Sequence, residues 1–395
     1  MQAHHFVCAV FLMITVTLSG EERAVNVRTS GTQSNAAIAA GPRGLIVVWN
    51  SYHSSNGRSY DILARRLDPN GEPEGDEFQV NPADEGRQCA PSVATDSEGR
   101  YVVAWQGPGG DQEDVYVRLY DADGQPRSDV FVAPDDPNDR QLRPRVAVDS
   151  NGDFVVVWEN RIADGNDEIY SVTGRWFSAS GRPRGVSLRL DEGTGDARYP
   201  DVALDARGNA AVTWLRDRDG KAVFARRFDP NGAPQTASFE VSSWSFSSMT
   251  GPSVAMNKAG HFVVVWDGDP NRAGDDKVLA RCYDPNGTAK GEPFRLDTSH
   301  EGAQQWPQVA IDDANAFVVV WQQEMPDPNT ATDIVGRRFD EAGYAVGEPM
   351  LLNAYTSGHQ RYPDVTFIPD GGIAAVWESE GQDGSSYGIR ACLFK

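Results

Sequence analysis

Aromatic residues stand directly before a proline at three places in the second half of the chain: Tyr199, Trp306 and Tyr362. Arg143 holds the same place before another proline. Further polar side chains lie upstream of the last two prolines: Gln304, Gln360, His300 and His359. Sugars stack their ring faces on aromatic side chains, and their hydroxyl groups need hydrogen-bonding partners such as amide, imidazole and guanidinium groups. These eight residues therefore predict a ligand-binding site suited to carbohydrate.

Some of these residues also fit a structural or a catalytic role. In the structural role, the aromatic rings wedge between neighbouring sheets and the glutamines cap strand ends. In the catalytic role, His359, Tyr362 and Arg143 form a lyase-like set, or two of the abundant carboxylates form a glycosidase pair. The sequence has no nucleophile elbow, metalloprotease helix or phosphate-binding loop. We therefore expect a binding protein rather than an enzyme, with a hydrolase or lyase as the alternative.

Acidic, glycine-rich segments such as RIADGNDE (161–168) and GDPNRAGDD (268–276) suggest a second kind of chemistry. Carboxylate and carbonyl oxygens are the ligands that calcium prefers. Solvated hairpin ends account for the same composition, because polar and glycine-rich residues favour turns. We therefore expect no cofactor, with calcium as the one candidate.

The elements that must position these residues form a repeat. Seven tryptophans recur at intervals of 52 to 56 residues, and a proline stands fourteen residues before each of the last six. The tryptophans are Trp49, Trp105, Trp158, Trp214, Trp266, Trp321 and Trp377. Each copy contains strand patterns like PSVATD, FVVVW and ARRFD, and most continue with one like EFQVN. Turns such as DSEG and DPNG separate the strands. Each copy therefore predicts a small sheet of four strands.

The FVVVW segments decide how the sheets are arranged. They occur at Phe154–Trp158, Phe262–Trp266 and Phe317–Trp321, and they show no alternation of apolar and polar residues. Both faces of such a strand must be covered. Seven four-stranded antiparallel sheets set radially around an axis meet that requirement. The sequence therefore predicts an all-β, seven-bladed β-propeller.

The two ends of the chain predict how the ring closes. The last copy ends in GIRACLFK and lacks a fourth strand, whereas Arg23–Val27 resembles that missing strand. We expect Arg23–Val27 to pair with Ile389–Phe394 and complete the last blade, which protects two sheet edges.

An arginine recurs in the third strand of six copies, and Cys392 takes its place in the seventh. The arginines are Arg65, Arg118, Arg175, Arg226, Arg281 and Arg337. Because the residue recurs in nearly every copy, we expect it to stabilise the blade through a cross-strand Arg–Trp stack or an Arg–Asp pair. A ring of ligand-binding arginines is the functional alternative.

The repeat pattern, from P-x-V-A-x-D through F-V-V-V-W to R-R-F-D-x-x-G, resembles a repeat found in large secreted bacterial proteins. The resemblance covers essentially the whole chain after its first residues. It implies a propeller scaffold and carries no catalytic residues with it.

The propeller hypothesis also predicts where a site lies. The loops that join strands two and three share one face with the loops that join successive blades. They vary among the copies, whereas the DSEG-type and DPNG-type turns of the other face are uniform. A single asymmetric site needs such variation. We therefore place the site at the channel mouth on the variable face.

Composition limits partners and location. The net charge of −21 argues against nucleic acid or an anionic membrane as partner. The apolar run Phe6–Leu18 is too short to span a bilayer and predicts a signal peptide at residues 1–20, although no Lys or Arg precedes it. An uncleaved anchor and a misassigned start codon are the alternatives. Residues 21–395 would form one domain.

We therefore expect a secreted monomer, extracellular or periplasmic, that binds carbohydrate or an extracellular protein. A structural or adhesion module without a small-ligand pocket is a third possibility. Cys89, Cys282 and Cys392 are too few and too scattered for a disulfide framework or a zinc site.

Overall fold

A computed structural model of the chain is all-β in the residues that it describes. These are residues 20–53, 59–82, 86–109, 112–136, 139–164, 167–193, 195–217, 220–242, 249–268, 276–297, 302–325, 331–369 and 371–394. Within these ranges no helix has the length and apolar character needed to cross a membrane. The expected signal peptide lies almost wholly outside them.

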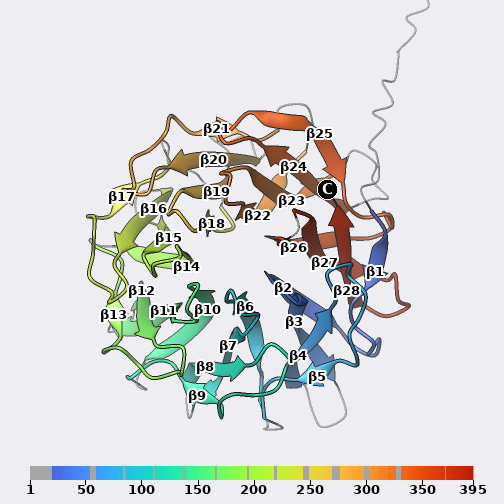
Figure 1. Cartoon of the computed structure of the whole chain (residues 1–395), viewed down its shortest axis with the longest axis horizontal. Helices are drawn as coiled ribbons and strands as arrows, with labels where there is room; N and C mark the ends of the chain where they lie inside the picture. Colours follow the sequence, from blue (N-terminus) through green and yellow to red (C-terminus); the bar gives the residue numbers. More distant parts are fainter. Residues whose placement is uncertain are drawn as a thin grey trace, which may run out of the picture.

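Seven four-stranded antiparallel sheets surround a central channel and form a seven-bladed β-propeller, as predicted (Figure 1). The innermost strands are β2 (Gln33–Gly41), β6 (Cys89–Thr95), β10 (Arg140–Val148), β14 (Asp196–Leu204), β18 (Ser253–Met256), β22 (Gln304–Ile311) and β26 (Gln360–Phe367). The second strands are β3 (Gly44–His53), β7 (Tyr101–Gly109), β11 (Phe154–Asp164), β15 (Ala210–Asp217), β19 (Phe262–Gly268), β23 (Phe317–Glu324) and β27 (Ile373–Glu380). The third strands are β4 (Ser59–Leu67), β8 (Gln112–Tyr120), β12 (Asp167–Phe177), β16 (Lys221–Phe228), β20 (Lys277–Tyr283), β24 (Thr332–Phe339) and β28 (Tyr387–Phe394). The outermost strands are β5 (Phe78–Gln79), β9 (Phe131–Val132), β13 (Leu188–Arg189), β17 (Phe239–Glu240), β21 (Phe294–Arg295), β25 (Ala345–Leu351) and β1 (Glu22–Ala24).

The first strand of the chain closes the ring. β1 pairs with β28, so that blade seven runs β26–β27–β28–β1, and the blue and dark red ends of the chain meet in Figure 1. Val25 N–H donates to the Ile389 carbonyl at 2.9 Å, and Ile389 N–H donates to Asn26 Oδ1 at 2.7 Å. In blade one, Asn81 accepts from the third-strand residue Ile62 in the same way, at 2.8 Å. The predicted closure is confirmed, and the N-terminal segment supplies the contacts of an ordinary fourth strand.

The tryptophans that define the repeat form the core. All seven are at most 1% exposed. Phe154–Trp158 at the start of β11 is buried throughout, because neighbouring blades cover both faces of that sheet. This confirms the expectation drawn from the FVVVW pattern.

The third-strand arginines stabilise the ring, mostly through partners other than the predicted ones. Each donates from Nη1 to a main-chain carbonyl of the preceding outermost segment, as Arg118 does to Val80 at 2.8 Å and Arg337 does to Leu296 at 2.8 Å. Five guanidinium groups also lie over the aromatic ring two residues later, as Arg226 lies 5.3 Å from the Phe228 centroid. The predicted tryptophan stack is therefore wrong. Within the described part of the chain, an acidic partner is present at two of the six, Arg175 and Arg226.

Candidate functional site

A bulge in the innermost strand of six blades positions the candidate residues. In blade three, Leu142 pairs with Glu159 and Arg145 with Val157, so Arg143 and Pro144 stand opposite Trp158 alone. The same irregularity is present in β2, β6, β14, β22 and β26. A bulge interrupts the alternation of side chains and redirects the residue within it. The repeated proline and tryptophan thus mark one redirected residue per blade.

The redirected residue adopts the left-handed conformation in six blades. Asn35, Ala90, Arg143, Tyr199, Trp306 and Tyr362 have φ between 49° and 54°, and Gly251 takes this place in blade five with φ of 134°. Left-handed backbone costs a residue other than glycine about 1 kcal/mol or more. Because the conformation recurs with quite different side chains, it belongs to the fold. Only the side chain differs from blade to blade.

These side chains meet around one cavity. The six residues other than Gly251 line a space of ≈ 470 Å³ in the channel, on the face of the variable loops. Four of the eight predicted site residues thus lie together in this lining, and their role in binding stays a prediction: Arg143, Tyr199, Trp306 and Tyr362.

Arg143 and Tyr199 form one side of this mouth. The Arg143 guanidinium lies 4.8 Å from the centre of the Tyr199 ring. Both residues are held by Glu159, which is 0% exposed. Its Oε2 accepts from Arg143 Nη1 at 2.8 Å, and its Oε1 accepts from the Tyr199 N–H at 2.6 Å. One buried carboxylate thus fixes a side chain in its own blade and a backbone in the next.

Trp306 and Tyr362 form the other aromatic pair. Their ring centres are 4.8 Å apart in an edge-to-face arrangement. The backbone N–H of Trp306 donates to Thr250 Oγ1 at 3.2 Å, and the Thr250 hydroxyl donates to Asp267 Oδ1 at 2.7 Å. Burial in the blade raises the pKa of Asp267 to about 7. Trp306 is therefore tied through a hydroxyl to a buried acid.

A second, deeper layer of the cavity contains Arg145, Asp201 and Asp364. Asp201 Oδ2 accepts from the Val254 N–H at 2.8 Å, and Asp364 Oδ2 accepts from the Ile38 N–H at 2.9 Å. Both contacts cross a boundary between blades. Burial in the channel wall raises the pKa of Asp201, and it raises the pKa of Asp364 to about 6. Arg145 lies 3.8 Å from Asp201 and lowers both values through its charge.

The structure does not bring Gln304 and Gln360 into this cavity. Both are 0% exposed inside their blades. Gln304 accepts from the Val278 N–H at 3.2 Å, and Gln360 donates to the Ser357 carbonyl at 3.4 Å. Their equivalent Gln88 accepts from the Trp105 indole N–H at 2.9 Å. In these positions glutamine supplies hydrogen bonds to the blade, so we leave both residues out of the site proposed below.

His359 is not among the residues that line the cavity. His359 is exposed near the rim, where its Nδ1 lies 3.3 Å from Thr332 Oγ1 and its N–H donates to Glu380 at 2.9 Å. His300 lies outside the described residues. The lyase-like set of His359, Tyr362 and Arg143 is therefore not assembled around the cavity.

The acidic loops fall partly outside the described residues, including most of 268–276. Among the residues that the structure does describe, no group of three or more His, Cys, Asp or Glu side chains is arranged to hold a metal ion. The cysteines in these ranges, Cys89, Cys282 and Cys392, form no disulfide.

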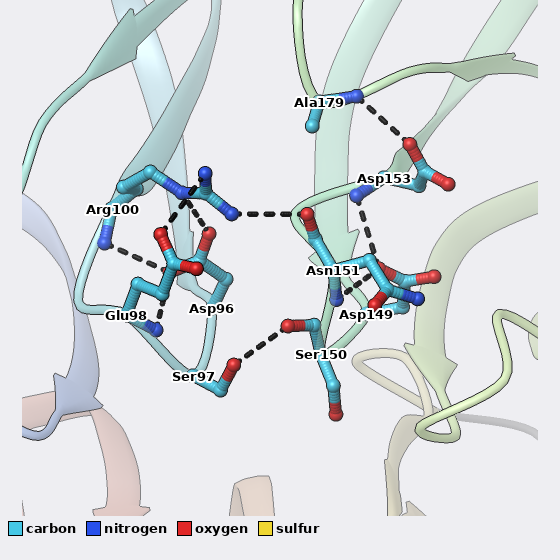
Figure 2. Close-up of polar contacts among 9 residues, drawn as sticks. All are labelled: Asp96, Ser97, Glu98, Arg100, Asp149, Ser150, Asn151, Asp153 and Ala179. Atoms are coloured by element: carbon cyan, nitrogen blue, oxygen red, sulfur yellow. Dashed lines mark hydrogen bonds and ion pairs between the residues drawn. The ribbon is translucent and has the colours of Figure 1, made fainter.

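The opposite channel mouth opens into a space of ≈ 650 Å³ lined by the turns between first and second strands. Figure 2 shows two of these turns. Asp96 Oδ1 accepts from the backbone N–H groups of Glu98 and Arg100, each at 2.9 Å. Arg100 and Ser97 then donate to backbone carbonyls of the next turn, at 3.0 and 2.6 Å (Figure 2). The aspartates of this face are engaged in holding turns and blades together.

Sequence reasoning missed Glu159, Arg145, Asp201 and Asp364. A signal for Glu159 exists, since an acid directly follows Trp158, Trp266 and Trp377. The second layer has one as well, because these residues follow the repeated proline. Neither pattern reveals that the side chains reach across blade boundaries.

No protein-family model and no curated protein sequence matches the chain. Solved structures share its fold. An ulvan lyase, a polysaccharide lyase bound to -[GlcA(1-4)Rha3S]-, is 9% identical, with a TM-score of 0.57 over 94% of this chain and 96% of that one. A protein of unknown function from Dyadobacter fermentans is 10% identical, with a TM-score of 0.56 over 80% of this chain and 96% of that one. An α-L-arabinofuranosidase from Fusarium graminearum is 11% identical, with a TM-score of 0.52 over 77% of this chain and 92% of that one. At such identities the likeness shows the β-propeller fold alone, on which two of these three proteins are carbohydrate-active enzymes.

Proposed function

We propose that this protein binds carbohydrate at the channel mouth on the variable face. The observation that carries the proposal is that Tyr199, Trp306 and Tyr362 line one cavity of ≈ 470 Å³. That volume lies within the range of small-ligand sites, which is roughly 300–1,000 Å³. Aromatic rings at the mouth offer stacking faces, and Arg143 and Gln308 in the same lining offer hydrogen-bond donors.

The rings are preorganised. Tyr199 and Trp306 are anchored through their backbone N–H groups, to Glu159 at 2.6 Å and to Thr250 at 3.2 Å. A ligand that stacks on anchored rings loses little binding free energy to ordering the protein. This supports a binding surface that exists before the ligand arrives. The carbohydrate-active enzymes among the similar folds lend the same ligand class support by analogy only.

A carbohydrate-active hydrolase or lyase at the same mouth is the second candidate. It is favoured by Asp364, whose pKa is raised to about 6 in the cavity lining, in the range of a general acid. Against it, Asp364 and Asp201 both accept backbone N–H groups of the next blade. Ser92 Oγ accepts from the Val146 N–H in the equivalent place at 3.2 Å. Because serine can replace aspartate at this position, the shared role of these residues is to hold neighbouring blades together.

The experiment is a glycan-array screen followed by calorimetric titration of any glycan found. Trp306→Ala and Tyr362→Ala should each weaken binding about 10- to 100-fold, since a lost stacking contact is worth roughly 1–3 kcal/mol. Tyr344→Ala is the matched control, because this tyrosine is 73% exposed at the start of the outer segment of blade six. A screen without binding, or equal loss in all three variants, would contradict the proposal.

Turnover separates the two candidates. Incubating the bound glycan with the protein should yield no shorter products if the mouth only binds. Products that disappear in Asp364→Asn while affinity is kept would establish the enzyme instead. A secreted, monomeric state and an extracellular protein ligand remain expectations, which chromatography with light scattering and fractionation would test.

A further inference from the structure

The seven redirected residues differ greatly in size, and their order around the ring is not random. The large ones are Arg143 and Tyr199 on blades three and four, and Trp306 and Tyr362 on blades six and seven. The small ones are Asn35 and Ala90 on blades one and two, and Gly251 on blade five. Large and small positions thus come in neighbouring groups.

Sevenfold geometry sets these groups against each other. Across the channel, β18 of blade five faces β2 and β6 of blades one and two, and the pair β10 and β14 faces the pair β22 and β26 (Figure 1). The two groups of large side chains therefore stand as facing walls. The small positions leave two gaps at opposite ends of the space between them.

Each wall is continuous along its length. The Arg143 guanidinium covers the Tyr199 ring at 4.8 Å, and the Trp306 ring meets Tyr362 at 4.8 Å. Polar groups from the layer below, including Gln308 and Ser253, line the same cavity as the walls. Two walls that each contain an aromatic ring, a floor that includes polar groups, and small residues at both ends describe a trough.

The gap at blade five is built into the backbone. Gly251 has φ of 134°, and a β-carbon there would stand 2.9 Å from Tyr199 Cβ. A side chain at this position would therefore strain the backbone and push against the wall. The gap at blades one and two depends only on side-chain size, because Asn35 and Ala90 share the backbone conformation of the aromatic positions.

The charges of the trough select among glycans. Arg143 is paired with Glu159 at 2.8 Å, and Arg145 lies 3.8 Å from Asp201. Both cations of the cavity lining are thus matched by carboxylates, while Asp364 adds a further acid. The whole chain carries a net charge of −21, which repels a polyanion.

We infer that the trough holds the interior of a neutral, unbranched glycan chain, which enters over blade five and leaves over blades one and two. The inference rests on the proposed carbohydrate function and adds the ligand class and its direction. A site closed on one side would instead hold a chain end. Two open ends let a long chain pass through, with sugar rings stacked on Tyr199 on one side and on Trp306 or Tyr362 on the other.

The test compares ligand lengths. Linear neutral series, such as cello-, xylo-, arabino- and β-1,3-gluco-oligosaccharides from disaccharide to hexasaccharide, are titrated against the protein. In the series that binds, affinity should rise with length and then level off. A hexasaccharide blocked at both ends should bind about as well as the free one.

Ala90→Tyr closes one gap with a side chain that the same backbone conformation carries at Tyr199 and Tyr362. It should reduce hexasaccharide affinity about tenfold and leave disaccharide affinity within about twofold. Asn35→Tyr closes the same gap from the next blade and should act alike. Ala342→Tyr, at an exposed turn, is the matched control and should change neither affinity.

The outcomes separate this inference from the proposed function. Binding that ignores chain length, that is lost when the ends are blocked, or that is untouched by both gap-closing variants overturns the trough and leaves the carbohydrate function standing. Binding of acidic but not neutral chains overturns the charge argument. Failure of every series and of the glycan array overturns both proposals.

Discussion

The two mouths of the channel are built by the same seven repeats, yet they use polar and aromatic residues in opposite ways. At the turn mouth, Asp205 Oδ1 accepts two backbone N–H groups of its own turn, at 2.8 and 2.9 Å, and its Oδ2 accepts from Asn209 Nδ2 at 2.7 Å. At the trough mouth, Glu159 accepts a hydrogen bond from the backbone N–H of Tyr199, and the Tyr199 ring lines the cavity. At the turn mouth the polar side chains hydrogen-bond to the turns, whereas at the trough mouth the aromatic side chains line the cavity.

The difference shows how a repeat protein acquires an asymmetric site. A backbone feature that six of the seven blades share, the left-handed residue in the bulge, presents one side chain in each of those blades at a fixed place. The fold carries the strain, and the identity of the side chain is then free to differ. The turns of the other mouth have less freedom, because in five of the seven blades an aspartate or asparagine caps the turn itself.

The pH dependence of stability should show the largest effect and should come from the trough half. Burial raises the pKa of Asp267 to about 7 and of Asp333 and Asp364 to about 6. Because these values exceed the unfolded value of about 3.9, the folded protein binds more protons between these limits. Stability should therefore fall as pH rises from about 4 through 7, and the melting temperature should be several degrees higher at about pH 5 than at pH 8.

Scanning calorimetry across this range checks the prediction, with a variant of one of these acids. Asp267→Asn should flatten the dependence. A melting temperature that rises steadily from pH 5 to pH 8 would show that the buried acids are not the dominant groups.

Removing a turn aspartate should have the next largest effect, on stability alone. Asp205→Ala leaves two turn N–H groups without their acceptor, which should cost about 1–3 kcal/mol of unfolding free energy. Urea titration measures the loss, and calorimetry with the bound glycan should give unchanged affinity. A loss of affinity equal to that of Trp306→Ala would mean that the two mouths are not separable.

Glu159 and Glu378 allow a matched test within the trough half. Glu378 holds the Asn35 N–H at 2.6 Å and Arg361 at 2.8 Å, as Glu159 holds Tyr199 and Arg143. Glu159→Gln should weaken glycan binding about 3- to 10-fold, because it releases both residues of one wall. Glu378→Gln should weaken it less, because Glu378 reaches the other wall only through Arg361, whose guanidinium lies 5.0 Å from the centre of the Tyr362 ring. Both should lose similar stability, which urea titration would show. If the two variants bind the glycan with equal affinity, the role of Glu159 is structural only.

The smallest effect concerns the strain stored at the trough mouth. Ala90→Gly relieves a left-handed alanine with φ of 52° and should raise stability by at most about 1 kcal/mol. Ala342→Gly, at an exposed turn outside this conformation, should lower it by up to about 1 kcal/mol. If urea titration shows that both variants change the unfolding free energy in the same direction, Ala90 is not strained.

The fold could be predicted because its determinants are local and repeated. The FVVVW segments encode a strand covered on both faces, and DxxG turns cap themselves through aspartate, as Asp229 does for Asn231 and Ala233, each at 2.8 Å. The closing strand could be recognised because the last copy lacks a fourth strand and Arg23–Val27 resembles one. Each of these signals needs only near neighbours or a count of copies.

The site could be predicted only in part, and the bulge is the reason. In an unbroken strand Gln304 and Trp306 would point to the same side, since side chains alternate with a period of two. The bulge with its left-handed residue breaks the alternation, so Trp306 lines the cavity while Gln304 is buried in the blade. Sequence proximity grouped the two residues, and backbone geometry separated them.

By itself, the sequence determined the number of blades, the strands in each, the tryptophan core and the way in which the ring closes. The tertiary structure decided which polar groups are consumed in the scaffold and which remain at the cavity. It also decided that Glu159 reaches Tyr199. The strands that carry the large residues, β10 and β14, lie across the channel from β22 and β26, which carry the other large residues. The physical reason is range. Strands and turns follow from interactions between near neighbours, whereas the site depends on contacts between blades about fifty residues apart, whose geometry is fixed only when all seven surround a common axis.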